Sequence, residues 1–332
     1  CTRRGLRGPR PVPAARRRTH ARGVALVVAL LVVALATILV AALLDRGELA
    51  FARTRNALRA EQVQAYAQGL EAYAIEALML PREGADSRQS RWAQPLSLQQ
   101  VRGGTLSASL RDLNGCFNLN NLAPGQASQW RELFTRLLAA LALDPRLGEA
   151  VAQWLDPAQA DGAPATAYLG GSVPYRVHGG LFSHVSELRL VRGVDANAYA
   201  RLAPHVCVLP PGSRINANTA GAPLLQALAG SGTAPATAAI GQQLWQDGRA
   251  QWADAQAFWR ATPLGSAPPG WAPLVDVYSD AFLMRGDIVL DQVPFTVFSV
   301  LLQRGGRVVA VQRSRGADEA LVAAVVLEPA AP

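Results

Sequence analysis

The sequence predicts an α+β protein in which a long N-terminal helix packs on a small antiparallel sheet and a large all-α domain is inserted into the sheet unit. An apolar run near the N-terminus continues into an amphipathic helical pattern that lasts to Pro81. Strand-like segments occur at residues 104–114 and between residues 281 and 314. The residues between them are rich in Ala, Leu and Trp and carry helix-capping signals, which indicates an inserted helical region.

The apolar run is long enough to cross a membrane. Residues 24–44 form a stretch of 21 residues in which Thr37 is the only polar side chain, and about 20 apolar helical residues span the hydrocarbon core of a bilayer. The arginines before Gly23 place residues 1–23 in the cytoplasm and the rest of the chain across the membrane. A cleavable secretory signal would have a shorter apolar region that ends at a small-residue cleavage site.

The helical pattern continues beyond the apolar run without a proline before Pro81. One face of this second part is predicted to pack on a domain, and its residues are Tyr66, Leu70, Tyr73, Ala77 and Leu80. A single helix of about 57 residues is therefore expected. The alternative, an anchor followed by a separate helix, requires a break near Gly47.

The predicted sheet strands lie on both sides of the helical region. In residues 104–114, Leu106, Ala108, Leu110 and Asp112 share one strand face. Three β-rich segments near the C-terminus are separated by DQVP and GG, which predicts an antiparallel meander of residues 281–290, 295–303 and 307–314. The helices expected between them are 128–141, 145–155, 185–191, 197–202, 222–229, 235–246 and 253–261, with caps at Ser183, Asp144 and Asn218-Thr219.

Net charge and cysteine content exclude several classes of function. The formal charge of +8 comes from eight arginines before Gly23, which leaves 24 basic against 24 acidic residues in the body and gives no general affinity for nucleic acid. The cysteines have no zinc-site spacing. Cys116 and Cys207 both lie beyond the membrane segment, where they either pair in an oxidising compartment or remain separate buried thiols.

No catalytic motif is present, so no catalytic residues are expected. Residues 215–240 resemble a helix-hairpin-helix whose turn LAGSG offers backbone N–H groups to a phosphate. No arginine lies between Arg214 and Arg249, so structural packing is the preferred interpretation and a membrane-tethered DNA-binding protein is the alternative. Ser183, His184 and Glu187 are interpreted as a helix cap rather than a relay.

The motifs, taken in order, resemble a known family. The segments that carry the resemblance are GVALVVALLVVALATILVAAL, RTRN, LRDLNGCFNLNNL, WLD, VSELRLVRGVD, YARLAPHVCVLP and INANTA. Together they are similar to the K minor pseudopilin of the bacterial type II secretion system, from about Arg22 to the C-terminal strands. The resemblance implies a pseudopilin fold, no enzymatic activity, and an inserted domain with helix-hairpin-helix or SAM-like units.

The resemblance also implies processing of the N-terminus. A prepilin peptidase would cut after Gly23 and methylate the new N-terminus at Val24. The fifth mature position, a glutamate in major pseudopilins, is Val28 here. An apolar residue suits a subunit that has no further subunit above it in the fibre, because a carboxylate without a neighbouring amine is costly in an apolar bundle. The implied segments are a basic leader (1–23), a transmembrane helix (24–44), its periplasmic continuation (45–80), an α+β domain (81–122 and 276–332) and an inserted helical domain (123–275).

The partners and bound groups follow from the same resemblance. It implies a single-pass inner-membrane protein with a periplasmic domain, which caps the pseudopilus tip with minor pseudopilins I and J and contacts the major pseudopilin and exoprotein substrates. It implies a Cys116–Cys207 disulfide. The calcium site of the family would lie near residues 162–169, which contain no acid here, so Asp156 and Asp161 remain as candidate ligands of an incomplete site. No nucleic-acid partner is expected.

Overall fold

A computed structural model describes residues 20–159, 162, 166, 168–170 and 174–315 of the 332-residue chain. These residues form two compact units, one that ends at Gln62 and one that begins at Val63. Helix α1 (His20–Met79) runs through Gly47 without a break, so the prediction of one long helix is confirmed. Its interior contains no proline and many Ala, Leu, Arg, Glu and Gln residues, which favour the helical conformation.

The second unit contains a five-stranded antiparallel sheet with the order β1-β2-β7-β8-β9. The strands are β1 (Leu96–Val101), β2 (Gly104–Asp112), β7 (Ala281–Leu290), β8 (Val293–Arg304) and β9 (Arg307–Arg315). Both turns of the β7–β8–β9 meander have positive φ at their two central residues, Asp291-Gln292 and Gly305-Gly306, as tight hairpins require. Strand β1 was not predicted, because the alternation of Leu96 and Leu98 stops at Gln100 and leaves too short a pattern to indicate a strand.

The end of α1 covers one face of this sheet. Val63, Leu70, Ala74 and Leu78 are buried against apolar side chains of the strands. The predicted packing face is therefore partly wrong, because Tyr73 and Leu80 are 48% and 42% exposed. The buried face is thus turned around the helix axis relative to the predicted one, so that Ala74 faces the sheet and Tyr73 does not.

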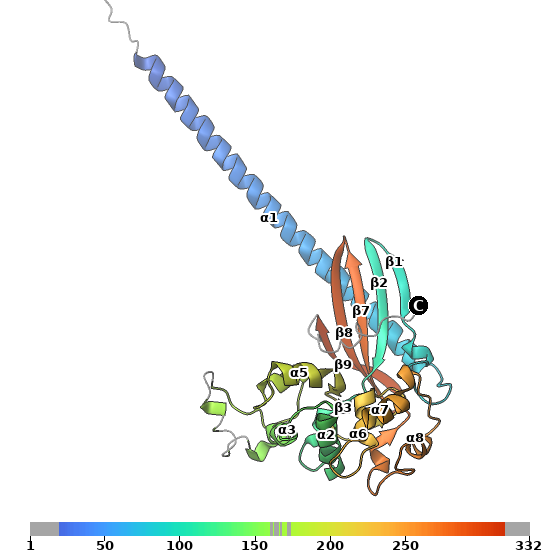
Figure 1. Cartoon of the computed structure of the whole chain (residues 1–332). Coiled ribbons are helices and arrows are strands. Elements are labelled where there is room, and N and C mark those ends of the chain that lie inside the picture. Colours follow the sequence, from blue (N-terminus) through green and yellow to red (C-terminus); the bar gives the residue numbers. More distant parts are fainter. Residues whose placement is uncertain (1–19, 160–161, 163–165, 167, 171–173, 316–332) are drawn as a thin grey trace, which may run out of the picture. The chain divides into compact units, whose positions relative to one another are not determined.

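The helices of the insertion gather at one end of the strands (Figure 1). They are α2 (Ser128–Ala140), α3 (Leu147–Leu155), α5 (Ala196–Leu202), α6 (Ala222–Leu228), α7 (Ala238–Trp245) and α8 (Ala255–Ala261). Short 3₁₀ helices are η1 (Arg91–Ala93), η2 (Leu119–Leu122), η3 (Pro157–Gln159), η4 (Val185–Leu190), η5 (Ala203–His205), η6 (Gln246–Gly248) and η7 (Ala272–Leu274). The predicted helices are thus present, although residues 185–190 form a 3₁₀ helix.

Three capping predictions need correction. Helix α3 begins at Leu147 without a side-chain cap, and Asp144 instead accepts a hydrogen bond from the Arg146 N–H. His184 caps η4, because its Nδ1 accepts a hydrogen bond from the Ser186 N–H while Glu187 accepts from the N–H groups of Ser183 and His184. This reciprocal cap supports the structural interpretation of the three residues over a relay. Helix α6 begins after Gly221, and no side chain caps it; Asn218 and Thr219 bond to other segments of the chain.

Two pairs of short parallel strands connect the helices to the sheet unit. Strand β3 (Phe117–Asn118) pairs with β4 (Val206–Cys207), and β5 (Ile215–Asn216) pairs with β6 (Val275–Asp276). A large core of Leu, Phe, Trp and Val side chains fills the helical region. Each short pair joins segments that are far apart in sequence, so the insertion is anchored where it leaves and re-enters the sheet unit.

Candidate functional site

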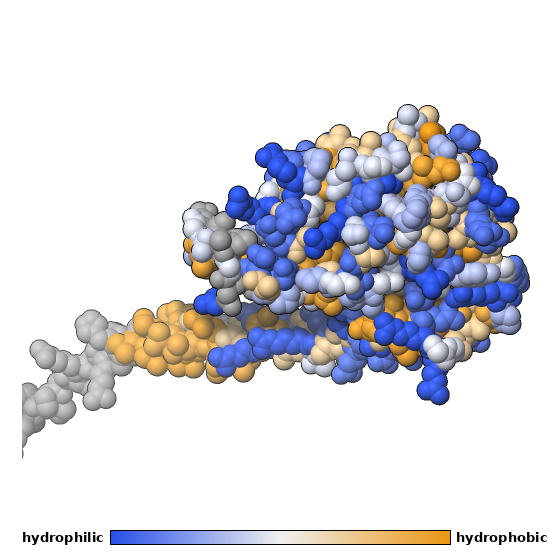
Figure 2. Space-filling model, turned by 90° about the horizontal axis from the view of Figure 1, so that it is seen from below, coloured by the Kyte–Doolittle hydropathy of each residue, from blue (hydrophilic) through white to orange (hydrophobic). Residues whose placement is uncertain are grey.

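The predicted processing site lies at the start of α1. Gly23 and Val24 are helical, and the side chains of Val24 and Val28 are 64% and 52% exposed. The apolar side chains that follow, up to Leu44, are exposed as well, and they give the start of the helix the continuous hydrophobic surface seen in Figure 2. Within the described residues, α1 is the helix that is long and apolar enough to cross a membrane. An apolar surface of this extent requires lipid or apolar partner helices around it.

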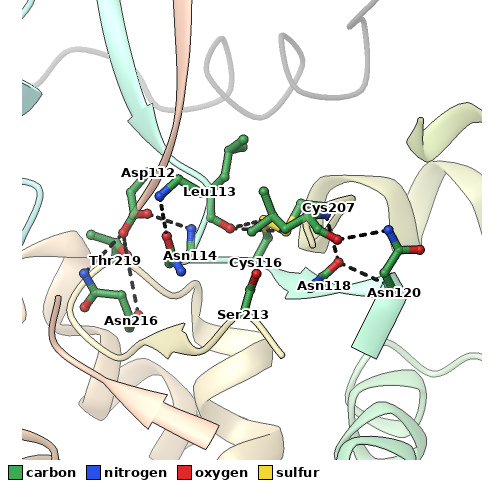
Figure 3. Close-up of a disulfide and its surroundings, with 12 residues drawn as sticks. Asp112, Leu113, Asn114, Cys116, Asn118, Asn120, Cys207, Ser213, Asn216 and Thr219 are labelled. Atoms are coloured by element: carbon green, nitrogen blue, oxygen red, sulfur yellow. Dashed lines mark hydrogen bonds between the residues drawn. A yellow bond between two sulfur atoms is a disulfide. The ribbon is translucent and has the colours of Figure 1, made fainter. Parts of the chain in front are cut away.

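Cys116 and Cys207 are bonded to each other in the structure, with their Cα atoms 5.8 Å apart (Figure 3). Both residues are buried, and Cys207 belongs to the β3–β4 pair. The bond links the segment that follows β2 to the segment that follows α5, 91 positions apart. It therefore ties the segment that leaves the five-stranded sheet to the helical insertion.

Asparagines of the LRDLNGCFNLNNL segment hold the loops around this disulfide. Asn118, Asn120 and Asn121 are almost completely buried, and their amides bond to backbone groups of Phe182, Leu209, Pro210, Gly212 and Ser213. A primary amide supplies both a donor and an acceptor. Each asparagine side chain can therefore bond to backbone N–H and C=O groups of a loop that has no neighbouring strand to bond to. These residues act as structural connectors, a role that their abundance in the motif alone does not specify.

Asp112 is the centre of a second buried junction. Its Oδ1 accepts a 2.7 Å hydrogen bond from the Asn114 N–H. Its Oδ2 accepts bonds from Asn216 Nδ2 at 3.2 Å, from Ser279 Oγ at 2.6 Å and from Thr219 Oγ1 (Figure 3 shows Asp112 with Asn114, Asn216 and Thr219). Burial raises the pKa of Asp112 to about 6 although these donors favour the carboxylate. The end of β2, the segment between β5 and α6, and the residues just before β7 thus meet at one carboxyl group.

The hairpin between α6 and α7 is organised around a buried arginine. Arg136 of α2 is 2% exposed, and its guanidinium donates to the carbonyl oxygens of Gly232 at 2.8 Å and Gly230 at 2.9 Å. It also pairs with Glu132 and lies 4.2 Å from the centroid of the Trp271 ring. The LAGSG turn therefore directs carbonyl oxygens towards an internal cation, which favours the packed structural interpretation of this hairpin.

The candidate calcium ligands are only partly described. Asp156 follows α3, and its Oδ1 accepts a 2.9 Å hydrogen bond from the Ala158 N–H, as in an ordinary Asx turn. Asp161 lies outside the described residues. In the part of the chain that the structure describes, no three His, Cys, Asp or Glu side chains come together as a metal site. Because calcium takes six to eight oxygen ligands, the described residues do not fit a complete site.

Comparisons with known proteins agree on one family. A family model for protein K of the type II secretion system matches residues 115–211. The chain is 30% identical over 316 residues to type II secretion system protein K of Klebsiella pneumoniae, covering 89% of this chain and 96% of that protein. It is 36% identical over 225 residues to the protein of the same name from Pseudomonas aeruginosa, covering 62% and 67% of the two chains.

The fold leads to the same group of proteins. A chain in the crystal structure of the GspK–GspI–GspJ complex from the enterotoxigenic Escherichia coli type 2 secretion system matches 80% of this chain with a TM-score of 0.67 and 26% identity. The match covers 99% of that solved chain. The similarity thus covers most of the chain, and the chain belongs to the type II secretion system protein K family.

Proposed function

We propose that this chain is a non-enzymatic minor pseudopilin that caps the tip of the periplasmic pseudopilus together with minor pseudopilins I and J, and so supports the export of folded proteins. The observation that carries the proposal is the similarity to nearly the whole of a chain solved within a GspK–GspI–GspJ complex. The buried polar clusters at Asn120, Arg136 and Asp112 bond to other groups of the protein, as structural junctions do.

In this proposal the prepilin peptidase removes residues 1–23 and methylates Val24. The mature chain crosses the inner membrane once, with residues 24–44 in lipid and the rest of the chain in the periplasm. The exposed apolar surface at the start of α1 supports this placement. Val28 at the fifth mature position supports a place at the tip, because a tip subunit has no neighbouring N-terminal amine above it for a carboxylate to pair with.

The proposed domains follow the sequence boundaries. Residues 45–80 continue the helix, residues 81–122 and 276–332 form the pseudopilin domain, and residues 123–275 form the insertion with helix-hairpin-helix or SAM-like units. The helical hairpin α6–α7 and the Arg136 contacts beneath it support such a unit with a structural role. Contacts with the major pseudopilin and with exoproteins belong to the same proposal.

Crosslinking in cells tests the proposal. A photoreactive amino acid in place of Tyr73, which is exposed on α1, should crosslink the chain to minor pseudopilin I or J, and removal of the chain should stop secretion.

The Val28→Glu variant tests the place at the tip. The new carboxyl group raises the free energy of membrane insertion by roughly 2–3 kcal/mol, so neither incorporation of the chain along the fibre nor secretion should increase. Increased incorporation along the fibre with secretion preserved would contradict a place at the tip. Tight, salt-sensitive DNA binding in a gel shift would instead favour the DNA-binding alternative.

A further inference from the structure

The contact between α1 and the sheet raises the question of what sets the position of the helix along its own axis. The buried apolar residues of α1 in this contact are Val63, Leu70, Ala74 and Leu78. Apolar burial has no directional preference, and residues one helical turn apart follow one another at about 5.4 Å. If α1 slipped by one turn along the sheet, each apolar contact would be taken over by the next apolar residue of the helix. Apolar packing alone therefore fixes the axial position of α1 only weakly.

One polar contact crosses this interface in a directional way. Glu71 is 8% exposed, and its Oε2 accepts hydrogen bonds from Arg313 Nε at 2.7 Å and from Ser299 Oγ at 2.9 Å. Its Oε1 accepts from Arg313 Nη2 at 2.7 Å. The guanidinium of Arg313 lowers the pKa of Glu71, so the carboxylate stays ionised in its buried position. A two-pronged arginine–carboxylate pair of this kind holds in one geometry and is lost on a shift of a few ångströms.

The neighbouring residue Leu70 fits a notch in the sheet. Gly286 lies in the middle of β7, where glycine is ordinarily unfavourable. A Cβ atom at Gly286 would lie 2.8 Å from Leu70 Cδ1 and 3.0 Å from Val297 Cγ2. The missing side chain therefore leaves the space that Leu70 occupies, and a displaced helix would have to move Leu70 out of it.

We propose that Glu71 and Leu70 form an axial lock, which holds α1 in one position along the sheet and allows load on the helix to pass to the folded unit. Glu71 supplies the directional bond through Arg313 and Ser299, and Leu70 supplies the steric stop at Gly286. Both are positioning residues. The lock itself depends only on contacts within the second unit; its use in carrying load rests on the proposed function.

Cysteine crosslinking in the full-length chain with a short thiol-reactive bifunctional reagent tests the lock. Arg315 Nη2 donates to Gln64 Oε1 at 2.6 Å, so a reagent about as long as these two side chains should bridge a Gln64→Cys, Arg315→Cys pair in the observed position. Gln68 lies one turn further along α1, so crosslinking of a Gln68→Cys, Arg315→Cys pair reports a slip of one turn. In membranes, Glu71→Ala and Leu70→Ala should each raise the ratio of slipped to native crosslink about tenfold, as the loss of a charged hydrogen bond or a buried contact predicts. Glu76→Ala, an exposed acid on the same helix, is the matched control and should leave the ratio unchanged.

Charge reversal separates a lock from general stability. The Glu71→Arg, Arg313→Glu double variant should restore the native crosslink ratio, whereas each single reversal should not. Glu71→Gln, which keeps the shape of the side chain, should give an intermediate ratio and serves if the alanine variant does not fold. A crosslink ratio in Glu71→Ala and Leu70→Ala equal to that of the unsubstituted chain would overturn the lock. Loss of secretion with a native ratio in Glu71→Ala would also count against it, and would leave the proposed function intact.

Discussion

Replacing Arg136 with methionine should destabilise the helical insertion strongly. Methionine keeps most of the side-chain volume but removes the guanidinium, which bonds to the carbonyl oxygens of Gly230 and Gly232 and more weakly, at 3.4 Å, to that of Ala227. The bonds to Gly230 and Ala227 are buried and the bond to Gly232 is partly buried, so water cannot readily replace the donor lost from the first two. A hydrogen bond to a charged group contributes about 1.5–3 kcal/mol, and removal of one partner from a buried charged network costs about 3–5 kcal/mol.

We therefore expect a loss of about 3–5 kcal/mol, a large part of the total stability of an ordinary domain. The melting temperature should fall by roughly 6–20 °C. The assay is thermal unfolding of the full-length chain in detergent, followed by near-ultraviolet circular dichroism, which reports the packing of Trp271 and other aromatic side chains.

Two further variants make the Arg136 test specific. Arg131→Met removes an exposed arginine from the same helix and should change the melting temperature little. Arg136→Lys keeps the positive charge but cannot reach several carbonyl groups in one plane or stack on Trp271 in the same way, so it should give an intermediate loss. A melting temperature of Arg136→Met within about 2 °C of the unsubstituted chain would refute the account of the hairpin, given the usual relation between free energy and melting temperature.

Three other predictions follow from the junctions and from the proposed processing. The pKa of Asp112 is about 6 in the folded chain against an ordinary value of 3.8; the folded state therefore binds the proton more tightly, and stability should fall by up to roughly 3 kcal/mol as the pH rises from 4 to above 6. Urea unfolding at both ends of this range should show the decrease, and Asp112→Asn should abolish it. Replacing Cys116 and Cys207 together with serine should lower stability by about 4 kcal/mol through loop entropy; if reductant has no effect on the unfolding of the unsubstituted chain, the bond is not a stabilising one. Replacing Gly23 with a bulky residue should leave an uncleaved membrane precursor, which intact-mass measurement of the purified chain would detect. Loss of residues 1–23 in that variant would exclude Gly23 as the processing residue.

Elements defined by local sequence could be predicted well. The continuous helix α1 follows from an uninterrupted helical pattern without proline. Strand β7 has the predicted bounds because apolar residues are bounded by turn signals on both sides. Strand β1 escaped prediction because the alternation of Leu96 and Leu98 stops at Gln100, and its middle residues are exposed. The buried face of α1 was misjudged because the sequence shows which residues are large and apolar, but not which side of the helix the completed fold turns towards the sheet.

The residues that hold the candidate sites together show the same limit more clearly. Asp112 is visible in the sequence as an acid on the apolar face of a strand, but Asn216, Thr219 and Ser279, which bond to it, lie more than 100 residues away. Nothing near Arg136 in the sequence indicates that its guanidinium lies beneath a turn more than 90 residues later. Such contacts depend on which segments the completed fold brings together, and that depends on the sum of many weak long-range contacts.

The sequence by itself determined the long apolar helix, the β2 and β7–β9 strands, most of the helices and the family resemblance, because period, turn residues and motifs are local properties of the chain. Only the tertiary structure decided how the insertion is attached. Three kinds of contact join segments that are far apart in the sequence. They are the two short parallel strand pairs, the Cys116–Cys207 bond and the hydrogen bonds to the carboxyl group of Asp112. The physical reason is that a buried polar group must find a partner wherever the fold supplies one, and the position of that partner is a property of the folded chain.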